Sequence, residues 1–141
     1  MTEPRNKSPN IARVTSTNLI NKFNQQLDSL TEAESTATFA TVMQPFDQYM
    51  TEFADELLHD YLMQNVHVDE AIRTASSDCS IKTFAIFTSM SMNRPLYEKI
   101  SKVETKNLSS EQAFIVDYWK ASFQASGIGK DQQTRDKIQV V

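Results

Sequence analysis

The chain has 141 residues, the size of one ordinary domain, so we expect a single hydrophobic core. Its 40% hydrophobic and 23% charged residues exclude collagen-like, wholly disordered and membrane-spanning proteins. The formal net charge is 14 − 18 = −4, and the fifty residues between Lys22 and Arg73 contain ten acids but no Lys or Arg. This distribution excludes the basic stripe that nucleic acids and anionic membrane surfaces require, so neither is expected as a partner.

Glycine is the compositional outlier, with 2 residues in the chain against a usual share of roughly 7%. Tight hairpins, phosphate loops and small β-sandwiches depend on glycine at positive φ, and 4 prolines do not replace it. The sequence therefore predicts an all-α fold. One cysteine excludes an internal disulfide, and one cysteine with 2 histidines is a small donor supply for a structural zinc site.

The beginning of the chain is polar. Residues 1–17 are rich in Thr, Ser, Asn and Pro, and they hold too little apolar surface to offset ordering entropy, so we predict a disordered tail there and a helical domain over 18–141. No signal-peptide core is present. A mitochondrial leader would be Arg-rich and free of acids, whereas Glu3 accompanies Arg5, so we expect a cytoplasmic protein, with mitochondria as the alternative.

Two helices are predicted in the first half of the ordered part. A short one spans about 19–30 and ends before a capping box at Thr31–Glu34, with Ser35 or Thr36 as a later cap. A long one of roughly 26 residues starts near Phe39, because one helical face of it is apolar throughout. Pro45 lies inside this helix and has no N–H for the Thr41 carbonyl, which predicts a kink. The apolar face consists of Phe39, Val42, Met43, Phe46, Met50, Phe53, Leu57 and Tyr61.

A second long helix follows a break around residues 64–68, with Asp69 as its N-cap. Residues 81–87 at its end are apolar all round, which predicts burial from several sides. The expected buried stripe consists of Val68, Ile72, Ala75, Cys79, Ile86 and Met90.

Three shorter helices are predicted after this one. Asn93-Arg94-Pro95 marks the start of a helix whose buried face is Leu96, Ile100 and Val103, since proline suits a first helical turn. Ser109 and Gln112 form a capping box for the next helix, and Gly127 is placed as its C′ residue. Asp131 is the expected N-cap of a last helix over residues 132–141.

No constellation of catalytic, cofactor-binding or metal-binding residues is predicted within this chain. His59 and His67 are separated by a helix break, and neither belongs to an H-E-x-x-H motif, so they are expected to be ordinary surface histidines. Cys79 lies on a core stripe and is expected to be an inert buried thiol. The segment 127–130 (Gly-Ile-Gly-Lys) superficially matches a phosphate loop, but no strand precedes it and a helix end is the better interpretation. The acidic pairs 55/56 and 69/70 fit a solvated helix face and a helix start.

Five segments together carry a resemblance to a known family. In chain order they are 38–46 (TFATVMQPF), 68–76 (VDEAIRTAS), 95–100 (PLYEKI), 108–127 (a leucine followed by E, F and G at fixed spacing) and 134–138 (TRDKI). Their order and spacing over residues 35–141 resemble the N-terminal region of the thimet oligopeptidase, neurolysin and saccharolysin family of zinc metallopeptidases.

The resemblance implies the N-terminal helices of a large, almost entirely α-helical metalloendopeptidase, a hydrolase of short peptides. Those helices wall a deep channel in which zinc, held by H-E-x-x-H and a later glutamate, activates the water that attacks a peptide bond. No position of this chain corresponds to the zinc ligands, so no catalytic residue is carried over and the chain alone is expected to be inactive and to need no zinc. The alternative is a stand-alone helical module that binds a partner helix or peptide.

A consequence for solubility follows from the resemblance. If residues 35–141 belong to a larger helical molecule, some apolar side chains face helices that lie elsewhere. We expect these to be residues 81–87, residues 138–141 and an aromatic group made of Phe114, Tyr118, Trp119 and Phe123. The isolated chain is then expected to be marginally stable, to bind a hydrophobic dye or to self-associate.

Overall fold

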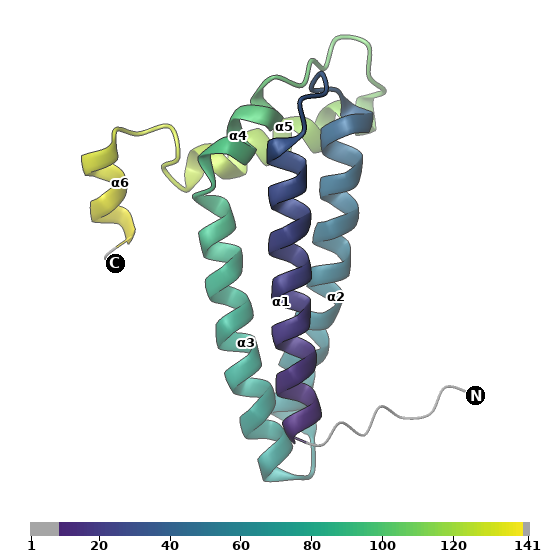
Figure 1. The fold of residues 1–141 in the computed structure, drawn as a ribbon, viewed down its shortest axis with the longest axis vertical. Coiled ribbons are helices and arrows are strands. Elements are labelled where there is room, and N and C mark those ends of the chain that lie inside the picture. The colour runs from purple at the N-terminus through teal and green to yellow at the C-terminus, as the bar shows by residue number, and fades with distance from the viewer. Residues whose placement is uncertain (1–8, 140–141) are drawn as a thin grey trace. The chain divides into compact units, whose positions relative to one another are not determined.

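The computed structural model describes residues 9–139, and the side chains of residues 16–137. This part of the chain is helical and contains no strand, which confirms the all-α prediction. Six α-helices and one π-helical turn follow one another (Figure 1). Their bounds are α1 Pro9–Glu32, η1 Phe39–Met43, α2 Gln44–Val66, α3 Glu70–Ser91, α4 Arg94–Ser101, α5 Ser110–Ala125 and α6 Gln132–Gln139.

The helices group into two compact units in place of the single core expected from chain length. The first unit takes the chain up to Gln26 together with Tyr49–Ile86. The second takes Leu27–Gln48 together with the chain from Phe87 onward. Helices α1, α2 and α3 each contribute residues to both units.

The first unit is a bundle of three helical segments, from α1, α2 and α3 (Figure 1). Phe23 of α1 and Phe53 of α2 are fully buried and stack with their ring centroids 4.3 Å apart. On the surface of the same unit, Lys22 forms an ion pair with Glu52 at 2.8 Å. Deeper in the unit, the Ser16 hydroxyl donates to the buried carboxylate of Asp60 at 3.3 Å.

Helix α1 is longer at both ends than the sequence pattern indicates. It begins at Pro9, where a first-turn proline costs no hydrogen bond, so residues 9–17 are helical and only residues 1–8 of the expected tail lie outside the description. It ends at Glu32, so Thr31 is not a cap; its hydroxyl donates to the Asp28 carbonyl at 3.0 Å within the helix. The burial of Leu27 and Leu30 explains why the helix continues past the expected boundary.

The next helix starts with a π-helical turn, and the cap is Thr38 instead of Ser35 or Thr36. Thr38 and Thr41 form a reciprocal capping box with each other's backbone N–H groups. The Gln44 N–H bonds the Phe39 carbonyl five residues back, and the α-helical pattern begins there. Pro45, which lacks an N–H, is the second residue of α2. At Pro45, where the sequence predicts a kink, the hydrogen bonding changes from π-helical to α-helical within one continuous helical segment.

The connection between α2 and α3 is held in place by its own side chains and by one side chain of α3. The His67 imidazole accepts the Asp69 N–H at 3.0 Å, and the Asp69 carboxylate accepts the Ala71 N–H at 2.8 Å, as expected of an N-cap. Arg73 donates from one Nη to the carbonyls of His67 and Val68, at 2.7 and 3.0 Å. Val68 itself is 94% exposed, so its placement in the buried stripe was wrong.

Helix α3 buries a partly polar face. Ile72, Ala75, Cys79 and Met90 are buried as predicted, and Ile86 is half-buried. The prediction that residues 81–87 are buried on several sides was wrong, because Ile81 and Phe84 are 67% and 53% exposed. In this segment Thr83 is buried, and its hydroxyl donates a hydrogen bond to the Cys79 carbonyl at 2.8 Å.

The second unit contains α4, α5 and α6 and confirms the predicted helix ends. The Asn93 side chain accepts the Leu96 N–H, Ser109 and Gln112 form the capping box, and the Asp131 carboxylate accepts the Thr134 N–H at 2.9 Å. Gly127 follows α5 with φ of 86°, a backbone conformation that favours glycine. The core of the unit is apolar and includes Leu96, Ile100, Val103, Val116, Phe123 and Ile128.

Within residues 9–139, none of the helices combines the length and the apolar character that a bilayer span needs.

Candidate functional site

The two histidines make different contacts. His67 uses its Nδ1 to accept the Asp69 N–H. The His59 Nδ1 lies 3.7 Å from the Asp60 carboxylate, and its side chain is 28% exposed, so His59 is more enclosed than a freely solvated position. Among the described side chains, no three His, Cys, Asp or Glu residues come together in a way that would hold a metal ion.

The other sequence candidates have structural roles. Cys79 is buried in the first unit, as predicted for an inert thiol. Residues 127–130 form the turn that ends α5, where the Lys130 N–H bonds the Gly127 carbonyl at 3.0 Å, so the helix-end interpretation is confirmed. Asp55 is exposed, and Asp69 and Glu70 begin α3.

An aromatic cluster in the second unit is the most prominent apolar feature. We define it as Phe46, Tyr97, Phe114, Tyr118, Trp119 and Phe123. Trp119 is its centre: Phe46 approaches edge-on at 4.8 Å, Tyr118 edge-on at 5.4 Å and Phe123 at 6.4 Å between ring centroids. Such edge-to-face pairs add about 0.5–1.5 kcal/mol each beyond their buried area. Trp119 therefore connects the inner and the outer members of the cluster.

The outer members of this cluster are open to solvent. Phe114 and Tyr118 stack on each other at 6.4 Å on the outer side of α5, and they are 70% and 55% exposed. We call this pair the α5 face. An apolar cavity of about 160 Å³ adjoins it. The cavity is lined by Phe87, Met90, Ser91, Tyr118, Trp119, Ser122 and Phe123.

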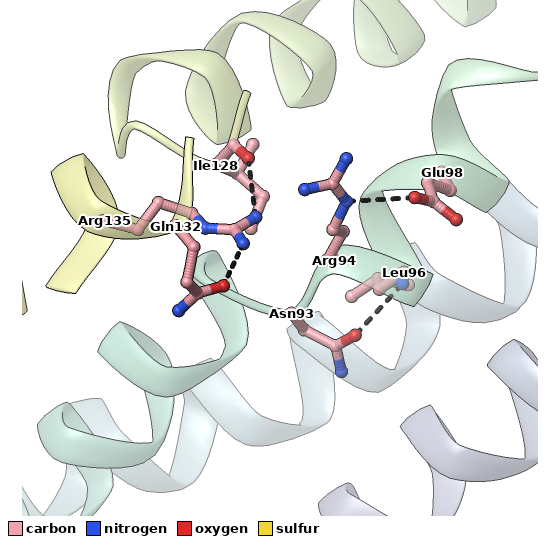
Figure 2. A network of polar contacts seen from close by, with 7 residues as sticks. All are labelled: Asn93, Arg94, Leu96, Glu98, Ile128, Gln132 and Arg135. Atoms are coloured by element: carbon pink, nitrogen blue, oxygen red, sulfur yellow. Dashed lines mark hydrogen bonds and ion pairs between the residues drawn. The ribbon is translucent and has the colours of Figure 1, made fainter. Parts of the chain in front are cut away.

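A second cavity, of about 380 Å³, is lined by residues at the starts of α4 and α6. We call it the arginine cleft; Figure 2 shows the side chains of Arg94 and Arg135, which belong to its lining. Its lining residues are Met92, Asn93, Arg94, Pro95, Gln132 and Arg135. Sequence reasoning missed this site, because it predicts the caps Asn93 and Asp131 but not that the two helix starts lie together.

The two arginines are held by different partners. The Arg94 Nε donates to Glu98 at 3.1 Å, while Arg135 donates to the Ile128 carbonyl at 3.4 Å and to the Gln132 side-chain oxygen (Figure 2). Arg135 thus bonds neutral acceptors, which do not cancel its charge.

Two pKa shifts have local causes outside the cavities. Gln124 donates to the Tyr97 hydroxyl at 3.3 Å, and this bond, with one from Ser101, lowers the pKa of Tyr97 below 10.0. The hydrogen bonds from the Thr134 N–H and hydroxyl lower the pKa of Asp131 below 3.8. Both shifts come from local hydrogen bonds that stabilise the charged form of the group.

No protein-family model and no curated protein matches the chain.

Proposed function

We propose that this chain is the N-terminal helical portion of a zinc metallo-oligopeptidase similar to thimet oligopeptidase, and that it shapes the substrate channel without taking part in the chemistry. The five ordered sequence segments support the proposal, because they extend over residues 35–141 with compatible spacing. The all-α fold agrees with it. In the complete enzyme the substrates are short peptides, the partner of this portion is the remaining peptidase fold, and the cytoplasm is the proposed location.

The α5 face is the observation that carries the proposal. Two large aromatic side chains, Phe114 and Tyr118, lie in water beside an apolar cavity. Exposing such a side chain forfeits roughly 1.5–3 kcal/mol relative to burying it. A contiguous exposed apolar area of this kind is typical of a surface that another protein segment covers. In a peptidase of this family, further helices would provide that cover.

The test is complementation of a peptidase that lacks its own N-terminal helices. The full chain is co-expressed with the catalytic portion of a thimet-oligopeptidase-like enzyme, and hydrolysis of a quenched fluorescent peptide is measured. We expect the two parts to copurify and hydrolysis to rise above that of the catalytic portion alone. Copurification without a rise in hydrolysis contradicts the channel role.

Three variants test whether the α5 face makes the contact with the catalytic portion. Phe114→Asp and Tyr118→Asp introduce a charge into the proposed contact and should abolish copurification. Lys106→Glu alters an exposed residue of the α4–α5 loop and should leave copurification unchanged. Equal behaviour of all three variants excludes the α5 face as the contact.

The alternative is a stand-alone helical interaction module with no enzymatic activity. The cavity beside Tyr118 favours it, since apolar anchors of a partner helix dock into grooves of this kind. The two functions differ in one simple observation: a genomic reading frame, or a neighbouring frame, that continues into H-E-x-x-H supports the peptidase, and a frame without it supports the module.

A further inference from the structure

The arginine cleft brings two positive charges to one cavity from helices that are far apart in sequence. Arg94 belongs to the first turn of α4 and Arg135 to the first turn of α6 (Figure 2). The cavity of about 380 Å³ is in the size range of small-molecule sites, roughly 300–1,000 Å³. The described residues that line it include no carboxylate, although Glu98 pairs with Arg94 and Asp136 accepts a hydrogen bond from Gln132. The lining itself therefore carries two positive charges, in a chain whose net charge is −4.

The charge of both arginines is available to a ligand. Glu98 engages only the Nε of Arg94, and both side chains of this pair are more than half exposed, which makes the ion pair weak and screened by salt. Within the described residues, no protein acceptor bonds the two terminal nitrogens of Arg94. A guanidinium has five N–H donors in a planar fork, so four of them remain for an oxyanion.

Arg135 is oriented but not neutralised. The Ile128 carbonyl and the Gln132 side-chain oxygen fix its guanidinium at the cavity wall, and both acceptors carry no net charge. Two guanidinium groups that share a cavity repel each other unless an anion lies between them. A phosphate monoester carries −1.5 to −2 charges at pH 7, which matches the pair better than the single charge of a carboxylate.

We propose that the arginine cleft binds the phosphate group of a small organic phosphate, with Arg94 and Arg135 as its ligands. The methionine and proline of the lining, Met92 and Pro95, provide an apolar wall for the organic part. This proposal does not depend on the peptidase assignment.

The experiment is a two-dimensional NMR titration of the full chain with inorganic phosphate at constant ionic strength. We expect saturable shifts of the backbone amides of residues 92–96 and 132–135, excluding Pro95. Arg94→Gln and Arg135→Gln should each weaken phosphate binding by about tenfold or more, since each removes charge-assisted hydrogen bonds. Lys106→Gln removes one positive charge from the same unit outside the cleft and should bind as the unchanged chain does.

Two further arms make the outcome decisive. Sodium chloride that produces the same shifts, or arginine variants that bind phosphate as the unchanged chain does, overturns the proposal. Sodium acetate that binds as tightly as phosphate overturns the phosphate assignment. Arg94 is more than half exposed, so Arg94→Gln should keep the far-UV circular dichroism spectrum, and Arg94→Lys, which keeps the charge but loses the fork, should also bind more weakly.

Discussion

Single side chains fix most helix boundaries in this molecule. Asn93, Ser109 and Asp131 each accept a backbone N–H at the start of a helix, and all three are predictable because the cap and its partner are three residues apart. Thr31 has the same local pattern and is not a cap. The buried side chains of Leu27 and Leu30 keep α1 helical past it, and a local pattern contains no information about that packing.

Asp131 makes the start of α6 sensitive to acid. Its folded pKa is lowered by the Thr134 hydrogen bonds, so its contribution to stability is present above the ordinary value of 3.8 and is lost as the pH falls through the lowered pKa. We expect the amides of residues 132–137 to exchange faster with solvent below that pH. Hydrogen exchange followed by NMR measures this loss of protection.

Asp131→Asn is the matched control for this titration. Asparagine is an equally good N-cap but has no proton to gain in this range. In the variant, the protection of α6 should show no titration below the ordinary aspartate value of 3.8. A wild-type α6 whose protection is independent of pH would contradict the capping role of the Asp131 charge.

At the scale of helices, the spacing of apolar residues predicts where the helices lie in the sequence. It is a poorer predictor of which face of each helix is buried. The predicted apolar face from Phe39 to Tyr61 is buried only in its middle, from Val42 to Phe53, whereas Tyr61 is 51% exposed. Helix α3 departs further from the prediction, because Ser76, Ser80 and Thr83 are buried while Ile81 and Phe84 are exposed. Sequence hydrophobicity does not predict a polar buried face, and it also gives no indication of the π-helical turn before Pro45.

The packing of α1 on α2 gives a quantitative prediction. Phe23 is 1% exposed and stacks on Phe53, so Phe23→Ala removes a buried aromatic ring and leaves a cavity. We expect the free energy of unfolding to fall by about 3–5 kcal/mol, measured by urea denaturation. Gln25→Ala on the exposed side of α1 should change it by less than about 0.5 kcal/mol. A loss below about 1 kcal/mol for Phe23→Ala would contradict the close packing of these helices.

At the scale of the whole molecule, the features that suggest function are not local in sequence. The arginine cleft joins residues about forty positions apart, and none of the motifs in the sequence connects them. The exposed aromatic side chains are different: the aromatic group at residues 114–123 is visible in the sequence, and Phe114 and Tyr118 are exposed as expected. Trp119 is half-buried and Phe123 is buried, so only the outer half of that group lies in water.

Exposed apolar surface should determine the solution behaviour of the isolated chain. We expect it to bind a hydrophobic dye and to self-associate, because Phe114 and Tyr118 are available to both. The double variant Phe114→Glu, Tyr118→Lys replaces them with an i,i+4 charged pair that supports the helix, and dye binding and association should both decrease. Dye fluorescence and sedimentation velocity measure the two effects.

The single variant Lys106→Gln serves as the reference for that comparison, since it changes charge without removing apolar surface. It should bind the dye as the unchanged chain does. A sharp melting transition of the unchanged chain that is independent of concentration, with no dye bound, would instead favour a self-sufficient module.

The position of the single tryptophan gives the chain a natural spectroscopic reporter. Trp119 lies in the second unit, edge-on to Phe46, whereas α-helical ellipticity arises from both units. Emission during urea unfolding thus follows the second unit, and ellipticity follows the whole chain. If the two curves coincide, the two units unfold as one cooperative structure; if emission changes at a different urea concentration, each unit has its own stability.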